Sequence, residues 1–312
     1  MKNITLYNGV EIPWVGYGTG VVLQYSRNPI LFMKWRIRLF LSSVKHLKLN
    51  RLLRVDFGIS KYLETAYSEN YRLYDSGRIY GYSEVKIGNL VRKHGRDGLF
   101  LISKVSDMDV ERKASPDSVN GNFELSLKYL NVDYLDMYLL HWPSGDWVNL
   151  YREMEKLYQE GKVKAIGVCN FNIENLEFLE NECSIKPMVC QTECHPLNVK
   201  KELREYCRSK SIVMMAHTPT GRMCEQIRQN GVLIELAKKY NKTIAQIIIR
   251  WHYQNGVIPI VSTCSKAHLI ENTIVDDFKL TPEEMIRIDA QDNEYIMLPF
   301  QGIDDPNYIY NL

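Results

Sequence analysis

The sequence is poor in paired cysteines: its 312 residues include 7 Cys, and none of their spacings forms a CxxC set. A cysteine content of about 2% is far below that of a disulfide scaffold, so we expect reduced thiols and a cytoplasmic protein. The sequence also lacks an excess of charge of one sign, because 39 Lys and Arg stand against 37 Asp and Glu. The resulting net charge of +2 excludes the strong positive field of a nucleic-acid-binding protein.

No hydrophobic run of the sequence is long enough, without charged residues, to span a membrane. The N-terminal residues lack the uninterrupted apolar stretch of a secretory signal, and nothing resembles a transit peptide. The most apolar candidate, residues 29–41, contains Lys34, Arg36 and Arg38, each of which costs roughly 2.5–3.5 kcal/mol at the bilayer centre. This candidate belongs to a basic stretch, residues 27–54, that contains no acidic residue.

What the sequence does contain is a regular alternation of two patterns. The dipeptide Asn8-Gly9 between short β-branched runs predicts an N-terminal hairpin. Eight later runs are rich in β-branched or aromatic residues and predict strands; they are residues 14–18, 71–75, 99–104, 134–141, 163–168, 188–191, 212–217 and 257–262. Helical patterns lie between most of these runs, at residues 84–94, 121–130, 147–161, 172–182, 199–210 and 232–255.

Alternating strands and helices predict parallel neighbours, because a parallel return needs a crossover connection. Eight such units favour a closed (β/α)₈ barrel, which would form one domain over residues 1–312. An open, doubly wound sheet is the alternative, but the turn GYGTG at residues 16–20 lacks the GxGxxG spacing of its phosphate loop. The stretch from about residue 22 to 68 is too long for one connection and predicts a helical insertion. The tail, residues 295–312, is expected to cover one barrel mouth.

The predicted insertion is basic, and two interpretations of it are open. Its apolar residues at helical spacing either pack a helical pair on the flank of the barrel or contact a membrane surface. Such residues are more often core than membrane contacts, so we favour packing on the barrel. The residues concerned are Leu31, Phe32, Trp35, Leu39 and Phe40.

Polar residues stand at the ends of the predicted strands, where this type of barrel places its active site. Asp75, Lys104 and His141 end consecutive strands, and Tyr80 follows Asp75 by five positions. A phenol has an ordinary pKa of about 10, so it is a poor acid at neutral pH unless a cation stabilises the phenolate. We expect Lys104 to supply this cation, Asp75 to be its counter-ion, and His141 to bind the oxygen that receives the proton.

Proton donation of this kind is what the reduction of a carbonyl group requires, because the proton meets the alkoxide that forms as hydride reaches carbon. No protein side chain delivers hydride, so a nicotinamide cofactor is implied. The other polar residues at strand ends complete a ring around the same mouth; they are Cys169, Asn170, Gln191, His217, Thr218, Ser262 and Thr263.

Six blocks of the sequence resemble the aldo-keto reductase family, in the family's order and over most of the chain. They are DSGRIYG at 75–81, LISKV at 101–105, YLLHWP at 138–143, AIGVCNF at 165–171, QTECHP at 191–196 and EN at 271–272. The resemblance implies a (β/α)₈ barrel that reduces aldehydes or ketones to alcohols with NADPH. It also implies that Tyr80 is the general acid, that Asp75 and Lys104 tune it, and that His141 orients the carbonyl group.

The resemblance further implies a cofactor site along the barrel mouth. Asn170 and Gln191 would hold the nicotinamide carboxamide, and Glu271 and Asn272 would meet the adenine end. Trp142 is expected to line the substrate pocket, and no metal site is predicted, since no cluster has a complete ligand spacing. The other residues expected to contact the cofactor are Thr19, Asp75, Cys169, His217, Thr218, Pro219, Thr220, Gly221, Ser262, Thr263 and His268.

Three departures from the family pattern concern the cofactor. Cys169 replaces a serine beside the carboxamide, and His217 replaces an aromatic residue that stacks on nicotinamide. Ser262, Thr263 and His268 stand where the family has lysine, serine and arginine around the 2′-phosphate, so two cations are missing. NADPH remains the expected cofactor, and NADH is the alternative.

A second class of function is a regulatory or docking barrel that binds the cofactor and turns over little. The complete set of Asp75, Tyr80, Lys104 and His141 argues against this class, because docking does not require a proton-donating phenol. The sequence therefore predicts an NAD(P)H-dependent oxidoreductase that acts on a small carbonyl compound.

Overall fold

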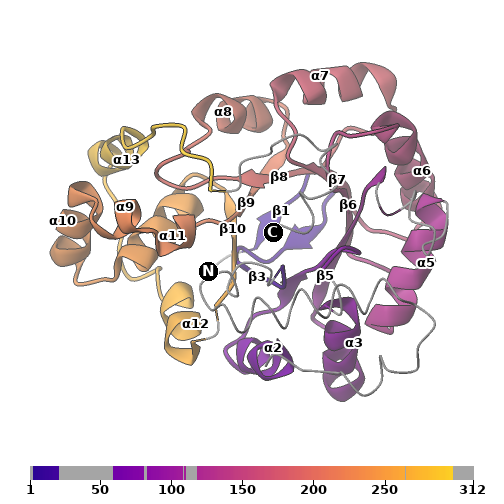
Figure 1. The fold of residues 1–312 in the computed structure, drawn as a ribbon, viewed down its shortest axis with the longest axis horizontal. Helices are drawn as coiled ribbons and strands as arrows, with labels where there is room; N and C mark the ends of the chain where they lie inside the picture. Colours follow the sequence, from indigo (N-terminus) through magenta and orange to yellow (C-terminus); the bar gives the residue numbers. More distant parts are fainter. Residues whose placement is uncertain are drawn as a thin grey trace.

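The structure, a computed structural model, describes residues 3–20, 59–80, 83–107, 109, 118–263 and 265–297. In this part of the chain, eight strands form a closed barrel in the order β10-β3-β4-β5-β6-β7-β8-β9, surrounded by helices (Figure 1). The predicted (β/α)₈ barrel is confirmed, and each predicted run overlaps one strand, although β5, β7 and β8 extend one or two residues beyond their runs. The strands are β3 (Gly16–Gly18), β4 (Leu73–Asp75), β5 (Phe100–Val105), β6 (Met137–Leu140), β7 (Ile166–Cys169), β8 (Val189–Glu193), β9 (Val213–His217) and β10 (Ile258–Val261).

The helices lie on the outside of the barrel and provide the crossovers between its strands (Figure 1). They pack with their apolar faces on the strands, as parallel sheets require. The described helices are α2 (Ile59–Ser68), α3 (Ser83–His94), α5 (Val119–Leu130), α6 (Trp147–Gln159), α7 (Ile173–Glu182), α8 (Lys201–Ser209), η3 (Gly221–Met223), α9 (Glu225–Arg228), α10 (Gly231–Tyr240), α11 (Ile244–Gln254), α12 (Lys266–Thr273) and α13 (Pro282–Asp289).

Two clusters of apolar side chains fill the fold, because successive residues of a strand point to opposite faces. On β4, Leu73 belongs to the cluster inside the barrel, whereas Tyr74 belongs to the cluster between strands and helices. Both side chains are fully buried. The barrel interior is therefore packed with side chains and is not a channel.

The N-terminal hairpin closes one end of the barrel. Its strands β1 (Ile4–Thr5) and β2 (Glu11–Ile12) pair antiparallel, and the buried Leu6 joins the cluster inside the barrel. Asn8 Nδ2 donates to Lys164 O at 2.9 Å, on the segment that leads into β7. The hairpin thus lies at the N-terminal ends of the strands and leaves their C-terminal ends for the site.

The helix predicted over residues 232–255 is in fact two helices, α10 and α11. Asn241 ends α10 in the left-handed conformation, with φ of 53°. Thr243 and Gln246 then form a capping box that starts α11, in which each side chain binds the backbone N–H of the other. The single-helix prediction was wrong because these stop and start signals follow one another within five residues.

The predicted insertion and tail are only partly within the described residues. Residues 59–68 of the insertion form α2, which is the crossover helix between β3 and β4, and residues 22–58 lie outside the described residues. In the tail, Met297 N donates to Glu193 Oε1 at 2.6 Å at the end of β8, and residues 298–312 lie outside the described residues. The helices that the structure describes include none that is long and apolar enough to cross a membrane.

Candidate active site

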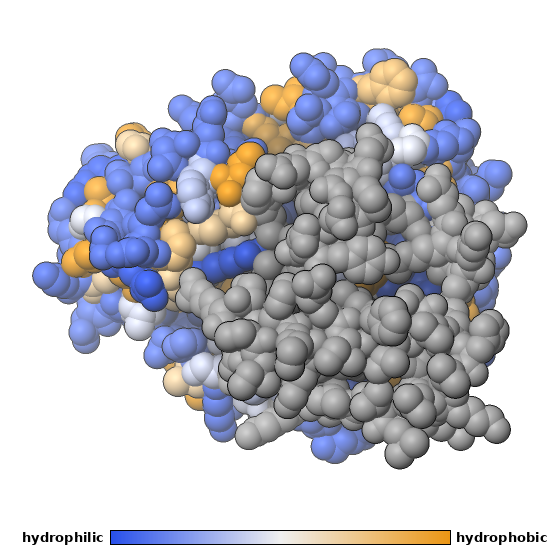
Figure 2. All heavy atoms as spheres, in the orientation of Figure 1, coloured by the Kyte–Doolittle hydropathy of each residue, from blue (hydrophilic) through white to orange (hydrophobic). Residues whose placement is uncertain are grey.

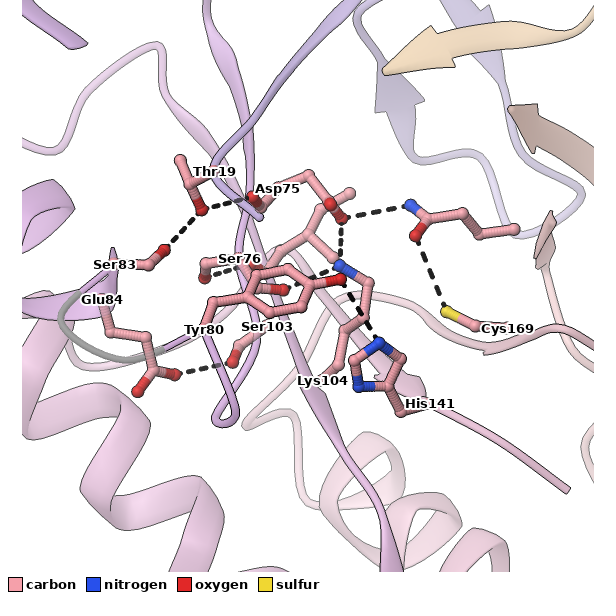
Figure 3. A network of polar contacts seen from close by, with 12 residues as sticks. Thr19, Asp75, Ser76, Tyr80, Ser83, Glu84, Ser103, Lys104, His141 and Cys169 are labelled. Atoms are coloured by element: carbon pink, nitrogen blue, oxygen red, sulfur yellow. Dashed lines mark hydrogen bonds and ion pairs between the residues drawn. The ribbon is translucent and has the colours of Figure 1, made fainter. Parts of the chain in front are cut away.

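The predicted polar residues lie on one rim of the barrel, because all its strands run in the same direction. Asp75 ends β4, Lys104 lies near the end of β5, and His141 directly follows β6. Tyr80 comes from the loop between β4 and α3 and points toward His141 (Figure 3). The structure therefore brings together all four residues that were predicted to be catalytic.

Lys104 and Asp75 form a buried ion pair on this rim. Lys104 Nζ lies 2.6 Å from Asp75 Oδ1 and donates a second hydrogen bond to Ser76 O at 2.8 Å. Gln191 Nε2 donates to the same carboxylate oxygen at 3.1 Å. Burial by itself lowers the pKa of Lys104, but the Asp75 carboxylate and the Tyr80 phenol together outweigh burial and hold this pKa above its ordinary value. Lys104 is therefore a charged ammonium at neutral pH.

Tyr80 lies beside the ion pair and contacts His141. Its hydroxyl is 3.3 Å from His141 Nε2, and Lys104 Nζ is 4.9 Å from the centroid of the Tyr80 ring. Burial raises the pKa of Tyr80 above its ordinary value, although the Lys104 ammonium acts in the opposite direction. Lys104 thus acts on this pKa in the expected direction, and the net pKa is still raised because one ammonium offsets only part of the cost of burying a phenolate.

His141 is neutral and presents one nitrogen to the Tyr80 hydroxyl. Burial lowers the pKa of His141 well below its ordinary value, and Lys104 and His217 lower it further. Its Nδ1 has no hydrogen-bond partner among the described residues, whereas Nε2 faces Tyr80. An unpaired buried donor is costly, so the single proton of the neutral ring is favoured on Nε2. Trp142 stacks on the ring, with centroids 3.6 Å apart.

The residues expected at the nicotinamide carboxamide contact one another. Asn170 follows β7 in the left-handed conformation (φ 62°), which Asn adopts more readily than most residues. Its Nδ2 donates to His141 O at 3.1 Å, and its Oδ1 lies 3.0 Å from His217 Nε2. Cys169 Sγ donates to Gln191 Oε1 across 3.8 Å. The two amide side chains offer donors and acceptors, so this group fits a carboxamide, which presents both.

His217 ends β9 and is uncharged at neutral pH. Burial lowers the pKa of His217 to about 4; the Glu193 carboxylate opposes this effect, and Lys104 adds to it. Its Nδ1 lies 3.3 Å from Thr218 Oγ1 and its Nε2 contacts Asn170, so both ring nitrogens have partners. The ring therefore has a defined orientation on the rim.

We expect His217 to make the folded protein sensitive to acid. Its pKa is lower in the folded state than the ordinary 6.5, so its contribution to stability is complete above pH 6.5 and is lost as the pH falls toward 4. His217→Gln should reduce the loss of unfolding free energy between pH 7 and pH 4 by at most about 3 kcal/mol, because the ring is partly exposed. Urea unfolding at both pH values measures this, with the exposed His268→Gln as control. If the unfolding free energy of the wild type, His217→Gln and His268→Gln depends equally on pH, the expectation is contradicted.

The segment after β9, residues 218–221, turns sharply and is held in place by α11. Thr218 and Gly221 both have φ of 54°, and Gly221 N donates to Thr218 O at 2.9 Å. The buried His252 of α11 contacts Pro219 O through Nε2 at 3.0 Å. The shape of this segment, which was expected to contact the cofactor, is thus fixed by contacts within the chain.

The residues expected at the 2′-phosphate gather between β10 and the start of α12. Ser262 directly follows β10, and Thr263 Oγ1 lies 3.4 Å from His268 Nδ1. Lys266 is the cation of this segment, and its Nζ forms an ion pair with Glu69 Oε1 at 3.1 Å. A hydroxyl group, that of Ser262, and an imidazole, that of His268, therefore stand where the family pattern has a lysine and an arginine.

The two residues expected at the adenine end lie on α12. The buried Asn272 contacts the Tyr71 hydroxyl, which also donates to Leu269 O at 3.1 Å. The backbone carbonyl of Glu271 accepts from Gln246 Nε2 at 3.2 Å, so it joins α12 to α11. Asn272 therefore takes part in the packing of α12, whereas the Glu271 side chain is partly exposed.

Sequence reasoning did not find the residues that support the Tyr80 loop. Arg78 and Glu84 form an ion pair of 2.8 Å, and they flank Tyr80 in the sequence. Thr19, which was expected to contact the cofactor, is buried and donates to Asp75 O at 2.8 Å. The sequence could have indicated the Arg78–Glu84 pair, because these oppositely charged residues lie six positions apart on either side of the predicted general acid.

This geometry defines a class of protein: nicotinamide-dependent oxidoreductases built on a (β/α)₈ barrel. A family model described as the aldo/keto reductase family matches residues 59–293. The chain is 36% identical over 292 residues to the glyoxal reductase of Bacillus subtilis (strain 168), across 92% of this chain and 91% of that protein. It is 35% identical over 242 residues to the methylglyoxal reductase of Yersinia pestis, across 76% and 83%.

A solved structure shows the same fold. The crystal structure of an aldo-keto reductase from Bombyx mori, in complex with NADP, matches with a TM-score of 0.78 at 26% identity and covers 99% of both chains. The chain therefore belongs to the aldo-keto reductase family. It is an oxidoreductase that reduces aldehydes or ketones with a nicotinamide cofactor, and the docking-barrel alternative is not favoured.

Proposed function

We propose that the protein reduces small 2-oxoaldehydes, such as methylglyoxal and glyoxal, with NADPH, and that Tyr80 donates the proton. The observation that carries the proposal is the contact of two pairs on one rim, Asp75 with Lys104 at 2.6 Å and Tyr80 with His141 at 3.3 Å. The substrate class rests on the names of two relatives, a glyoxal reductase and a methylglyoxal reductase.

The residues of the rim move the proton and stabilise the charge that its transfer leaves. When bound, the nicotinamide supplies hydride to the carbonyl carbon. His141 Nε2–H polarises the carbonyl oxygen, and the Tyr80 hydroxyl donates its proton to the same oxygen. The pKa of Tyr80 is raised, but an alkoxide is a stronger base than a phenolate, so the transfer is favourable. The Lys104 ammonium then stabilises the phenolate, and Asp75 keeps the ammonium in place.

The cofactor is proposed to lie across the rim from β7 to α12. Asn170 and Gln191 would bind the carboxamide, and His217 would lie against the nicotinamide ring. Thr263 and His268 would meet the 2′-phosphate. Hydrogen bonds from uncharged groups to phosphate are roughly half as strong as charge-assisted ones, so we expect only a small preference for NADPH over NADH.

The test is turnover by the purified protein. NADPH absorbance should fall when methylglyoxal or glyoxal is added, and kcat/KM should be higher for these compounds than for propanal, whose carbonyl group is not activated. NADH should support the same reaction with kcat/KM lower by roughly tenfold or less, the effect of about 1.4 kcal/mol. Binding of NADPH without oxidation by any aldehyde would support the docking barrel. A preference for propanal would contradict the substrate class.

Two further predictions remain proposals. Residues 1–312 would form one domain, and the protein would be cytoplasmic, which the absence of disulfides among the described cysteines supports. The basic stretch at residues 27–54 lies outside the described residues, so we propose no membrane contact for it.

The described surface in Figure 2 is largely hydrophilic with scattered hydrophobic residues, as is normal for a protein that exposes such residues singly.

A further inference from the structure

A buried ion pair supports the loop that carries Tyr80. Arg78 Nη1 lies 2.8 Å from Glu84 Oε2, and the two side chains are 11% and 2% exposed. Arg78 belongs to the loop after β4, and Glu84 belongs to the first turn of α3. The pair therefore ties the part of the loop just before Tyr80 to the helix that begins just after it.

The same carboxylate also holds the strand that carries Lys104. Ser103 Oγ donates to Glu84 Oε1 at 2.7 Å (Figure 3). Because Arg78 contacts Oε2, each oxygen of Glu84 has its own partner. Ser103 immediately precedes Lys104 on β5, and their side chains point to opposite faces of the strand. Glu84 thus connects, through one side chain, the loop of the proposed acid and the strand of its neighbouring cation.

Arg78 has further contacts that restrict its own position. Its backbone N–H donates to Lys104 O at 3.2 Å, and its Nε donates to Asn122 Oδ1 at 3.4 Å. Its guanidinium carbon lies 5.3 Å from the centroid of the Tyr129 ring. Asn122 and Tyr129 both belong to α5, so Arg78 joins the Tyr80 loop to β5, α3 and α5. A planar guanidinium with several fixed partners allows little movement of the backbone that bears it.

We propose that Arg78 and Glu84 are positioning residues that set the place of the Tyr80 hydroxyl, without touching the substrate or the cofactor. This inference rests on the proposed function of Tyr80 as general acid. A general acid must approach the reacting oxygen to within about 2.6–3.2 Å, and a misplacement of about 1 Å can lower the rate roughly 100-fold. Loss of the ion pair should therefore reduce kcat through Tyr80, with little effect on binding.

The experiment is a double-mutant cycle between Arg78 and Tyr80. Arg78→Met should lower kcat for methylglyoxal roughly 10- to 100-fold, while KM and the Kd of NADPH, measured by fluorescence, stay within about threefold. In the Tyr80→Phe background, Arg78→Met should lower kcat no further, because it acts through the missing hydroxyl. Glu84→Gln, which keeps the shape of the side chain, should act in the same direction and serves if Arg78→Met does not fold.

The matched control is another ion pair, which is partly buried, with side chains 5% and 26% exposed. Arg204 of α8 and Asp289 of α13 lie 2.9 Å apart, on the opposite side of the barrel from α3 (Figure 1). Arg204→Met should destabilise the fold and leave kcat unchanged. An equal loss of kcat in this control, or an undiminished effect of Arg78→Met in the Tyr80→Phe background, would overturn the inference. If Tyr80→Phe itself keeps full activity, the proposed function fails with it; if only Arg78→Met keeps full activity, the inference alone fails.

Discussion

Replacement of Tyr80 by phenylalanine is expected to lower kcat by a factor of roughly 10²–10⁴, the usual contribution of a general acid. The change removes one hydroxyl, which lies 3.3 Å from His141 Nε2, and leaves the ring in place. Without it, the oxygen keeps the hydrogen bond from His141 Nε2–H but loses the phenol that donates the proton. Steady-state turnover of methylglyoxal with NADPH measures the loss, and the Kd of NADPH, from fluorescence titration, should remain unchanged.

The control for this prediction is a second buried tyrosine. The Tyr151 hydroxyl on α6 is buried and has no partner among the described residues. Tyr151→Phe therefore removes the same atom from a fully buried position away from the rim, and it should leave kcat within a factor of two or so. If Tyr80→Phe and Tyr151→Phe behave alike, Tyr80 is not the proton donor.

Asp75→Asn is expected to produce the largest loss of stability. The substitution leaves the Lys104 ammonium, whose side chain is 0% exposed, without its counter-ion. Removing one partner of a buried ion pair typically costs about 3–5 kcal/mol of unfolding free energy, and kcat should fall as well because Lys104 loses its anchor. The pKa of Lys104 is raised by folding, so the pair contributes fully at pH 7 and loses its contribution only in alkali, above the ordinary lysine pKa. Urea unfolding at pH 7 is the measurement.

A second variant separates the effect of losing the ion pair from the effect of leaving one buried charge without a partner. In Asp75→Asn/Lys104→Met, no charge remains buried without a partner, so the double variant should be more stable than Asp75→Asn alone. Its kcat should stay low, because the cation beside Tyr80 is gone. If the loss of stability in the double variant equals the sum of the losses in Asp75→Asn and Lys104→Met, the ion-pair account is contradicted.

The fold and the ring of polar residues were predictable because they depend on local signals. Strand runs ending in Asp75, Lys104 and His141 determine the rim once the strands are parallel, since parallel strands end on the same side of the barrel. The break between α10 and α11 was also present in the sequence, at Asn241 and Thr243, and a closer interpretation of cap residues would have found it.

Quantities that depend on the depth of burial were not predictable. The raised pKa of Tyr80 results from surroundings contributed by several separate strands and loops, and no local pattern reports how completely they exclude water. The contacts of Glu84 were hidden for a related reason. Its two oxygens meet Arg78 and Ser103, and only the packing of α3 on β5 brings these two residues to one carboxylate.

The hairpin that closes the N-terminal end of the barrel has a kinetic consequence. With the interior filled and that end closed by the described residues, the dinucleotide and the carbonyl compound of the proposed reaction would both enter from the rim of Tyr80 and His141. The alcohol product must leave by the route through which the next aldehyde arrives. In the proposed reaction, whichever molecule lies deeper would enter first and depart last, so the architecture would set the order of the catalytic cycle.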